Sequence, residues 1–173
     1  MFIKGKNPIE KLVIAWDLDG TLIDSSHRQR IVKGEFDLDY WLKHCKEEFI
    51  MKDSLLPLSQ IFYEFQKTGF TQICVTARVL READFKFFEK YNLNFDMIIH
   101  REDSLELDEV LKDKKLQDFF EKEGLIPFQA YDDKEENLKV FDKYGFRTFQ
   151  ASYLNKVLKV DNYKNINFKP KDF

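Results

Sequence analysis

Two carboxylates stand one residue apart in the segment DLDGT, residues 17–21, directly after an apolar run. Active sites of open parallel sheets lie beyond the carboxyl ends of the strands, so Asp17 and Asp19 can face the same small volume. One carboxylate can attack as a nucleophile while the other gives and takes a proton. The alternative is an acidic strand end that only caps a turn. The Gly-Thr that follows and the apolar VIAW before favour the catalytic interpretation.

A second pair of carboxylates, Asp132 and Asp133, ends another apolar run at residues 127–131. If the two runs form neighbouring parallel strands, all of these carboxylates meet at one edge of the sheet. Such carboxylates repel one another unless a hard cation lies between them, and Mg2+ with oxygen ligands is the natural occupant. The alternative role is an N-cap for the helix that follows. Both roles can hold at once.

Thr76 and Arg78 follow a third apolar run, residues 71–76, and carry groups that bind phosphate. A hydroxyl and the backbone N–H groups of a strand-to-helix turn can hold phosphoryl oxygens, and a guanidinium can add a bidentate contact. Taken alone, Thr76 is more typical of an N-cap than of a ligand. By the same standard, Lys112 on a charged helix is more typical of a solvated surface than of a catalytic site.

The elements that must position these residues alternate short apolar runs with longer amphipathic stretches. This rhythm is typical of a parallel sheet covered by helices, and it predicts an α/β fold with a central, mainly parallel sheet of about five strands. Gly69, Gly124 and Gly145 follow three of the predicted helices as stop signals. The predicted strands are residues 11–17, 71–76, 96–100, 127–131 and 146–150, and the predicted helices are 58–67, 82–91, 107–122 and 134–144.

Two regions fall outside this rhythm. Residues 24–53 are predicted to form a small cap insertion over the site, with a helix at 39–49. Residues 155–173 are predicted to form a C-terminal tail, packed on the surface or partly disordered, after a single domain at 1–154. His27, Arg28, Arg30 and Lys33 in the insertion could grip a second phosphate or a base. Its rings, Tyr40 and Trp41, either stack on a nucleobase or only pin the insertion to the core.

The composition limits the kinds of partner that the chain can attract. The 173 residues contain 28 Lys and Arg against 31 Asp and Glu, a net charge of −3, so no bulk positive field attracts long nucleic acid or an anionic membrane. Two cysteines, Cys45 and Cys74, are too few for a secreted disulfide scaffold. The sequence has neither a signal-peptide pattern nor a membrane-spanning run, and we expect a cytoplasmic protein, in the host cytoplasm if it is phage-encoded.

The order of these motifs, DxDGT, T-A-R, a helical lysine and DD, resembles the haloacid dehalogenase (HAD) superfamily of phosphohydrolases over residues 11–151. The resemblance implies a HAD-like Rossmannoid three-layer sandwich and a Mg2+ cofactor. It implies that Asp17 forms an aspartyl-phosphate, that Asp19 is the general acid and base, that Thr76 orients the phosphoryl group and that Lys112 neutralises charge. Lys114 or Lys115 could replace Lys112 if the helix register differs. The implied metal-binding residues are Asp17, Asp19 through its backbone carbonyl, Asp132 and, in support, Asp133.

A narrower resemblance is to the phosphatase domain of phage polynucleotide kinase/phosphatase and its stand-alone phage relatives. It implies that Arg78 and Arg101 flank the phosphate, and we assign Thr21, His27 and Arg28 to substrate binding beside them. The stretch after Arg101 departs from those relatives, because it reads SLELD where they carry a more basic loop. The departure leaves room for a mononucleotide. The matching segments are Ser26-His27-Arg28, Thr76-Ala77-Arg78, His100-Arg101-Glu102, DEVLK and Tyr131-Asp132-Asp133.

The sequence therefore predicts a Mg2+-dependent phosphomonoesterase acting on 3′-phosphate ends of nucleic acid or on nucleotides. A nucleoside monophosphatase without polynucleotide activity is the alternative within the same chemistry. A second alternative is a catalytically silent protein that only binds a phosphorylated ligand, and a third is an interaction protein that works through its C-terminal tail. These 173 residues contain no GxxxxGK[ST] motif, so we expect no counterpart of the kinase half of the bifunctional relatives.

Overall fold

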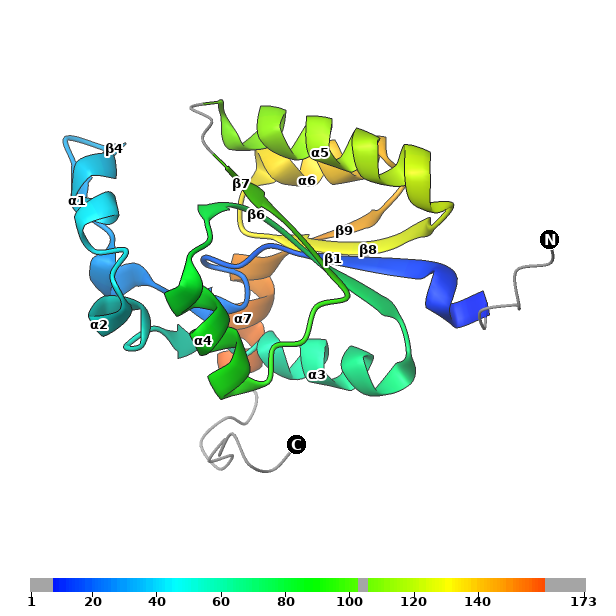
Figure 1. Cartoon of the computed structure of the whole chain (residues 1–173), viewed down its shortest axis with the longest axis horizontal. Coiled ribbons are helices and arrows are strands. Elements are labelled where there is room, and N and C mark those ends of the chain that lie inside the picture. Colours follow the sequence, from blue (N-terminus) through cyan, green and yellow to red (C-terminus); the bar gives the residue numbers. More distant parts are fainter. Residues whose placement is uncertain (1–7, 103–105, 161–173) are drawn as a thin grey trace.

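The computed structural model describes residues 8–102 and 106–160, which form a three-layer α/β structure (Figure 1). Its centre is a five-stranded sheet in the order β7-β6-β1-β8-β9, and every neighbouring pair is parallel. The predicted fold class is therefore confirmed. The strands of this sheet are β1 (Leu12–Trp16), β6 (Thr71–Val79), β7 (Met97–Arg101), β8 (Ile126–Asp132) and β9 (Arg147–Gln150).

Helices cover both faces of the sheet. One face carries α5 (Asp108–Glu123) and α6 (Glu135–Lys143), and the other carries α3 (Ser59–Thr68), α4 (Glu82–Tyr91) and α7 (Ala151–Val160) (Figure 1). The central strand β1 has a continuous apolar sequence because both of its faces are buried. Val13 and Ala15 pack under α5 and α6, whereas Ile14 and Trp16 pack on the opposite side. The strand that leads to Asp17 is thus held from all sides.

Most predicted boundaries agree with the structure to within one residue, and α4 begins and ends where it is predicted. Strand β6 is the main exception, because it continues to Val79 and therefore contains Thr76 and Arg78. Its pairing with β7 shifts register between Val75 and Val79. An irregularity of this kind re-aims side chains next to active sites. The strand was predicted to end at Thr76, and the structure has this break in pairing there instead.

The segment between β1 and α3 contains the insertion. Strands β2 (Ile23–Asp24) and β5 (Ser54–Leu55) pair antiparallel and close its base. Between them lie a short 3-10 turn (Ser26–Arg28), the hairpin of β3 (Ile31–Val32) and β4 (Glu35–Phe36), and the helices α1 (Leu38–Lys43) and α2 (Glu47–Ile50). Figure 1 shows that β4 and α1 project from one side of the molecule.

The prediction of one helix over 39–49 is wrong. Helix α1 ends at Lys43, and the backbone of Lys46 is extended, with φ −107° and ψ 156°, before α2 begins. The hairpin was also missed. Its turn contains Lys33 and Gly34, both with positive φ (54° and 86°). Two consecutive positive φ values match the right-handed twist of the paired strands, and Lys-Gly is a weaker signal for them than Asn-Gly.

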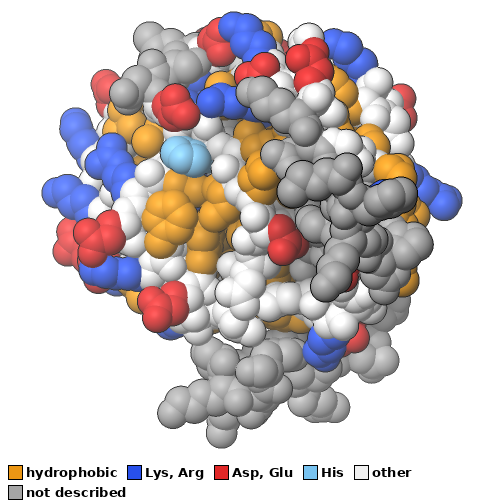
Figure 2. Space-filling model, turned by 45° about the vertical axis from the view of Figure 1, so that its right-hand side comes forward, with side chains coloured by type: hydrophobic (Ala, Val, Ile, Leu, Met, Phe, Trp, Pro, Cys, Tyr) orange, Lys and Arg blue, Asp and Glu red, His pale blue; other side chains and the backbone are white. Residues whose placement is uncertain are grey.

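The C-terminal region also differs from the prediction. Residues 155–160 are the second half of α7 and belong to the folded domain, while the rest of the predicted tail, 161–173, lies outside the described residues. Leu154 and Leu158 pack against the apolar cluster that contains Ile14 and Trp16 of β1. No helix in the described ranges is both long and apolar enough to cross a membrane. On the face shown in Figure 2, acidic and basic side chains intermingle around exposed apolar ones.

Candidate active site

Asp17 lies at the carboxyl end of β1 and is almost completely buried. Its backbone N–H still donates to the carbonyl of Tyr131 at 3.0 Å, so the neighbouring strand β8 fixes its position. The ammonium of Lys112 donates to Asp17 Oδ1 at 2.8 Å and to Asp132 Oδ2 at 2.5 Å. Lys112 is therefore the lysine of α5 that reaches the strand ends, and its side chain is only 1% exposed.

The ion pairs of Lys114 and Lys115 show that neither of them takes the place of Lys112 in the site. Lys114 and Lys115 pair with Glu106 and Glu102 on the outside of the helix. Burial alone would lower the pKa of Lys112, but the two carboxylates outweigh it and hold the pKa above its ordinary value. Lys112 is thus a fixed positive charge beside Asp17.

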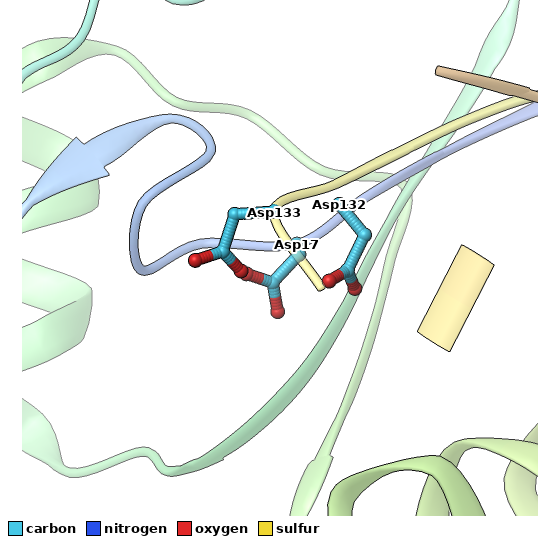
Figure 3. Close-up of side chains that lie close together, drawn as sticks. All are labelled: Asp17, Asp132 and Asp133. Atoms are coloured by element: carbon cyan, nitrogen blue, oxygen red, sulfur yellow. The ribbon is translucent and has the colours of Figure 1, made fainter. Parts of the chain in front are cut away.

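Three carboxylates converge at the ends of β1 and β8. Asp17, Asp132 and Asp133 each place one oxygen within 4.8 Å of the others, and their carboxyl groups project from the two adjacent strand ends (Figure 3). All of these ligand atoms are hard oxygens, which are the atoms that Mg2+ prefers. The donor set therefore fits the predicted Mg2+.

Asp132 is oriented by α6. Its Oδ1 accepts hydrogen bonds from the backbone N–H of Lys134 at 2.9 Å and from Asn137 Nδ2 at 3.0 Å. The predicted N-cap role is thus partly present, because the bond from Lys134 lies at the start of α6, whose N-cap residue is Lys134. Sequence reasoning missed Asn137. The only available signal was its place five residues after Asp132, in the first turn of the predicted helix, and the structure shows that it is buried.

The turn after Asp17 is shaped by Gly20. Its φ is +78°, and a Cβ at this position would lie 2.6 Å from Asp133 Oδ2. Only glycine combines this backbone conformation with so close an approach. The same turn is held from α7 by Asn155, whose Nδ2 donates to the carbonyl of Thr21 at 3.0 Å while its Oδ1 accepts from Leu58 N–H at 2.8 Å. Asn155 was missed because it lies in the predicted tail.

Asp19 differs from Asp17 in its partners. Its Oδ1 accepts from Ser25 Oγ at 2.5 Å and lies 3.2 Å from Arg78 Nη2, and its side chain remains 23% exposed. Burial raises the pKa of Asp19, and the hydrogen bond from Ser25 opposes this effect. An upward shift of the pKa is the direction expected for a carboxyl group that must give a proton. Ser25 was not singled out from the sequence.

Thr21 lies beside Asp17, and Thr76 lies in β6, the strand that pairs with β1. Thr21 is fully buried, with its hydroxyl 3.5 Å from Asp17 Oδ2. Thr76 Oγ1 accepts from the backbone N–H of Arg78 at 3.1 Å. Among the described residues, none accepts a hydrogen bond from the hydroxyl of Thr76. Thr76 lies within the irregular stretch of β6 between Val75 and Val79, and its role as a phosphate-orienting hydroxyl stays a prediction.

Two of the arginines predicted to bind substrate have protein partners in the structure. Arg28 was expected to grip substrate, but it is completely buried and donates to both carboxylate oxygens of Asp53. Arg101 directs its guanidinium to the carbonyls of Ala77 and Glu106 and to Asp108, all at 2.8–2.9 Å. Arg28 is buried and Arg101 is partly buried, and protein acceptors bind both guanidinium groups. Neither is a free phosphate ligand in this conformation.

The insertion's other candidates also have protein partners. His27 Nε2 lies 2.8 Å from Asp53 Oδ1, although the imidazole is 36% exposed. The Trp41 ring lies under Arg28, 4.1 Å from the guanidinium carbon. Tyr40 stacks on His44 at 3.9 Å and on Arg30 at 4.4 Å. These contacts favour the second role considered for the two rings, that of pinning the insertion.

Comparison with known proteins places the chain in a family. Residues 4–122 match the family described as bacteriophage T5 5′-deoxynucleotidase. The 5′-deoxynucleotidase of Escherichia phage T5 is 30% identical over 171 residues, which covers 86% of this chain and 70% of the relative. The chain belongs to this family. The predicted resemblance to a HAD-type phosphatase is confirmed with it.

Solved structures agree on the fold of this T5 5′-deoxynucleotidase family member. A chain of the Pnkp1/Rnl/Hen1 RNA repair complex matches with a TM-score of 0.58 and 19% identity, over 87% of this chain and 45% of that one. The present chain thus spans less than half of that relative. A haloacid dehalogenase-like hydrolase from Streptococcus pneumoniae, SP0104, matches with a TM-score of 0.57 and 17% identity over 79% and 82% of the two chains. At these identities the likeness concerns the fold.

Proposed function

We propose that this protein is a Mg2+-dependent phosphatase that hydrolyses deoxynucleoside 5′-monophosphates through an aspartyl-phosphate on Asp17. The observation that carries the proposal is the convergence of Asp17, Asp19 and Lys112 at one sheet edge in a chain of the T5 5′-deoxynucleotidase family. The substrate class comes from the relative's name. The phage origin of that relative supports action in the cytoplasm of an infected cell.

The chain itself favours a small substrate over a nucleic-acid strand. Between Arg101 and Lys112 the sequence is EDSLELDEVL, which has several acidic residues and no basic one. Binding of a polynucleotide depends on basic side chains that replace the counterions of successive phosphates. A single phosphate needs only a few cationic groups at the site. This supports nucleotidase activity over the predicted activity on 3′-phosphate ends.

In the first step a carboxylate oxygen of Asp17 attacks phosphorus, and the P–O bond to the 5′-oxygen breaks. Asp19 gives its proton to the departing 5′-oxygen, so that the deoxynucleoside leaves as a neutral alcohol. Thr76 donates to a phosphoryl oxygen. Burial raises the pKa of Asp17, and Lys112 opposes this effect and so favours the ionised nucleophile. Lys112 also balances the charge on the phosphoryl group.

In the second step Asp19 takes a proton from water, which attacks phosphorus and releases inorganic phosphate and Asp17. The cation would be held by Asp17 and Asp132, with Asp133 and the backbone carbonyl of Asp19 in support. When bound, Mg2+ supplies positive charge to the phosphoryl oxygens and offsets the gathered carboxylates.

The primary test measures phosphate release from deoxynucleoside 5′-monophosphates, 3′-monophosphates and a 3′-phosphorylated oligonucleotide, with Mg2+ and with EDTA. Asp17→Asn is expected to abolish release. Asp24→Asn is the matched control, because this half-exposed carboxylate caps Ser26 N–H at 3.0 Å in the same segment and does not contact Asp17. Preference for the 3′-phosphorylated oligonucleotide, or release without metal, would refute the proposal. No release from any ester would favour a silent phosphate-binding protein.

A burst experiment tests the covalent intermediate. The nitrophenolate of p-nitrophenyl phosphate leaves without being protonated, whereas hydrolysis of the phosphoenzyme still needs a base. Asp19→Asn should therefore release about one nitrophenolate per enzyme quickly and then turn over slowly. The same variant should show no burst with a deoxynucleotide. A linear time course with p-nitrophenyl phosphate, together with no phosphorylated protein after acid quenching, would exclude the intermediate.

A further inference from the structure

Asp53 is a completely buried carboxylate that the proposed reaction does not use, yet three nitrogen-bearing side chains converge on it. Arg28 donates through Nε and Nη2, both at 2.8 Å. Arg78 donates through Nη2 at 3.1 Å, and His27 Nε2 lies 2.8 Å from the other oxygen. Two buried guanidinium groups repel each other unless a carboxylate lies between them. Asp53 is therefore the centre of a charge cluster.

The position of Asp53 in the chain makes this cluster a link between the insertion and the sheet. Asp53 directly precedes β5, whose pairing with β2 closes the insertion. Arg78, in contrast, belongs to β6 in the central sheet. Asp84 of α4 lies 3.0 Å from Arg78 Nη1, and the Trp41 ring covers the guanidinium carbons of Arg28 and Arg78 at 4.1 and 5.5 Å. The guanidinium of Arg78 is thus fixed from several elements.

The fixed guanidinium contacts the proton-transfer residue. Arg78 Nη2, the nitrogen that donates to Asp53, also lies 3.2 Å from Asp19 Oδ1. Ser25 Oγ donates to the same Oδ1 at 2.5 Å. Among the described residues, none donates a hydrogen bond to Asp19 Oδ2. One oxygen of Asp19 is therefore held by the protein, and the other remains available for proton exchange.

We propose that Asp53 is a positioning residue for catalysis: it holds Arg78 in place, and Arg78 in turn holds the Asp19 carboxyl with Oδ2 available for proton transfer. This inference rests on the proposed function, in which Asp19 exchanges protons with the leaving group and with water. Asp53 itself contacts neither. Its effect belongs to the reaction steps, since Asp19 acts during bond breaking and not in initial binding.

The central variant is Asp53→Asn. It keeps the volume of the side chain, but it removes the charge and one of the two acceptor oxygens, so that Arg28 and Arg78 compete for the remaining one. Asp37→Asn is the matched control. Asp37 also accepts from an arginine of the insertion, Arg30, and caps α1 at Tyr40 N–H, a role that asparagine fills equally well. It has no contact with Arg78.

Steady-state kinetics are measured on a deoxynucleoside 5′-monophosphate and on p-nitrophenyl phosphate. For Asp53→Asn we expect kcat to fall about 10- to 100-fold, the range for a misplaced catalytic group, with KM changed less than about threefold. The loss should appear with both esters, because the attack of water on the phosphoenzyme needs Asp19 in either case. Asp37→Asn should stay within about twofold of the wild type.

A double-mutant cycle separates positioning from a structural role. In an Arg78→Lys background, Asp53→Asn should lower kcat no further, because its effect passes through the lost guanidinium. If Asp53→Asn does not fold, Asp84→Asn replaces it in the same cycle, since asparagine keeps the hydrogen bond to Arg81 N–H while the carboxylate beside Arg78 Nη1 is removed. Thermal unfolding reports the folded fraction of every variant.

The outcomes are distinct. A variant with a lower melting temperature but unchanged kcat per folded molecule, a rise in KM alone, or full additivity with Arg78→Lys would each overturn the positioning role. Wild-type activity on p-nitrophenyl phosphate but on no nucleotide would overturn the proposed function, and the positioning role would be decided on that ester. Wild-type inactivity on both esters would overturn the two proposals together.

Discussion

Replacing Lys112 by methionine removes the only ammonium that contacts the carboxylates of Asp17 and Asp132 in the described part of the chain. The side chains are of similar length, so the change is chiefly one of charge. Breaking one buried ion pair costs about 3–5 kcal/mol of unfolding free energy. Because a single ammonium serves two carboxylates at 2.8 and 2.5 Å, we expect a loss near the upper end, about 5 kcal/mol, in the absence of metal.

The assay is urea unfolding followed by circular dichroism at pH 7.5, first in EDTA and then with increasing Mg2+. A cation that binds only the native state adds about 2.7 kcal/mol when its concentration is 100 times Kd. Lys112→Met should gain more from Mg2+ than the wild type, because its site has one positive charge fewer. The phosphatase activity that the wild type shows with Mg2+ should be lost in Lys112→Met.

Lys114→Met is the control for this experiment, because Lys114 is a 64% exposed residue of the same helix. It should change stability by no more than about 0.5 kcal/mol. The reasoning is refuted if Lys112→Met in EDTA lies within about 1 kcal/mol of the wild type. It is also refuted if Mg2+ stabilises both proteins equally.

Three further predictions concern the surroundings of the site. Gly20→Ala should cost about 1–2 kcal/mol of backbone strain and weaken the apparent Mg2+ affinity measured by activation, because a Cβ would displace Asp133. Gly145→Ala has a similar φ of +87° but open space around it, so it should show the strain alone, and equal Mg2+ curves for the two variants would contradict this. Asn155→Ala leaves the N–H of Leu58 and the carbonyl of Thr21 without their partner, so we expect the free energy of unfolding in urea to fall by about 1–3 kcal/mol and kcat to fall as well. A lower stability with unchanged kcat would show that the contact from α7 does not support catalysis. Hydrogen bonds from the end of α6 lower the pKa of Asp113 below its ordinary 3.8, so its ionised form stabilises the native state above about pH 4 and this contribution is lost as the pH falls further. Asp113→Asn should therefore flatten the acid side of the stability curve, and an unchanged slope there would contradict the assignment.

The sequence was sufficient to predict those site residues whose position depends only on the local pattern of apolar and polar residues. Each catalytic candidate on the sheet follows or ends an apolar run, and parallel topology brings such strand ends to one edge. Asp17 and Asp132 could therefore be paired without knowledge of the fold. Lys112 needed more, because only the family resemblance selected it among the lysines of a charged helix.

The parts that could not be predicted depend on contacts between distant segments. Asp53 lies 25 residues from both Arg28 and Arg78, and nothing in its neighbourhood distinguishes it from an exposed carboxylate. Arg28 was assigned to the substrate for the same reason, since its charge was visible but its burial was not. Asn155 lies in a stretch rich in polar and basic residues whose leucines were not recognised as a helix face.

The order of strands in the sheet has a consequence for folding during synthesis. Strand β1 is translated before the other four strands of this sheet but lies in its middle, and its two partners, β6 and β8, follow far behind in the sequence. During synthesis the apolar segment that leads to Asp17 therefore has no strand to pair with until Thr71 emerges, and its second edge stays open until Ile126. Such late pairing slows folding and leaves an unpaired, aggregation-prone strand edge exposed to other nascent chains. The proposed nucleophile, Asp17, is thus translated before either of the two strands that flank β1.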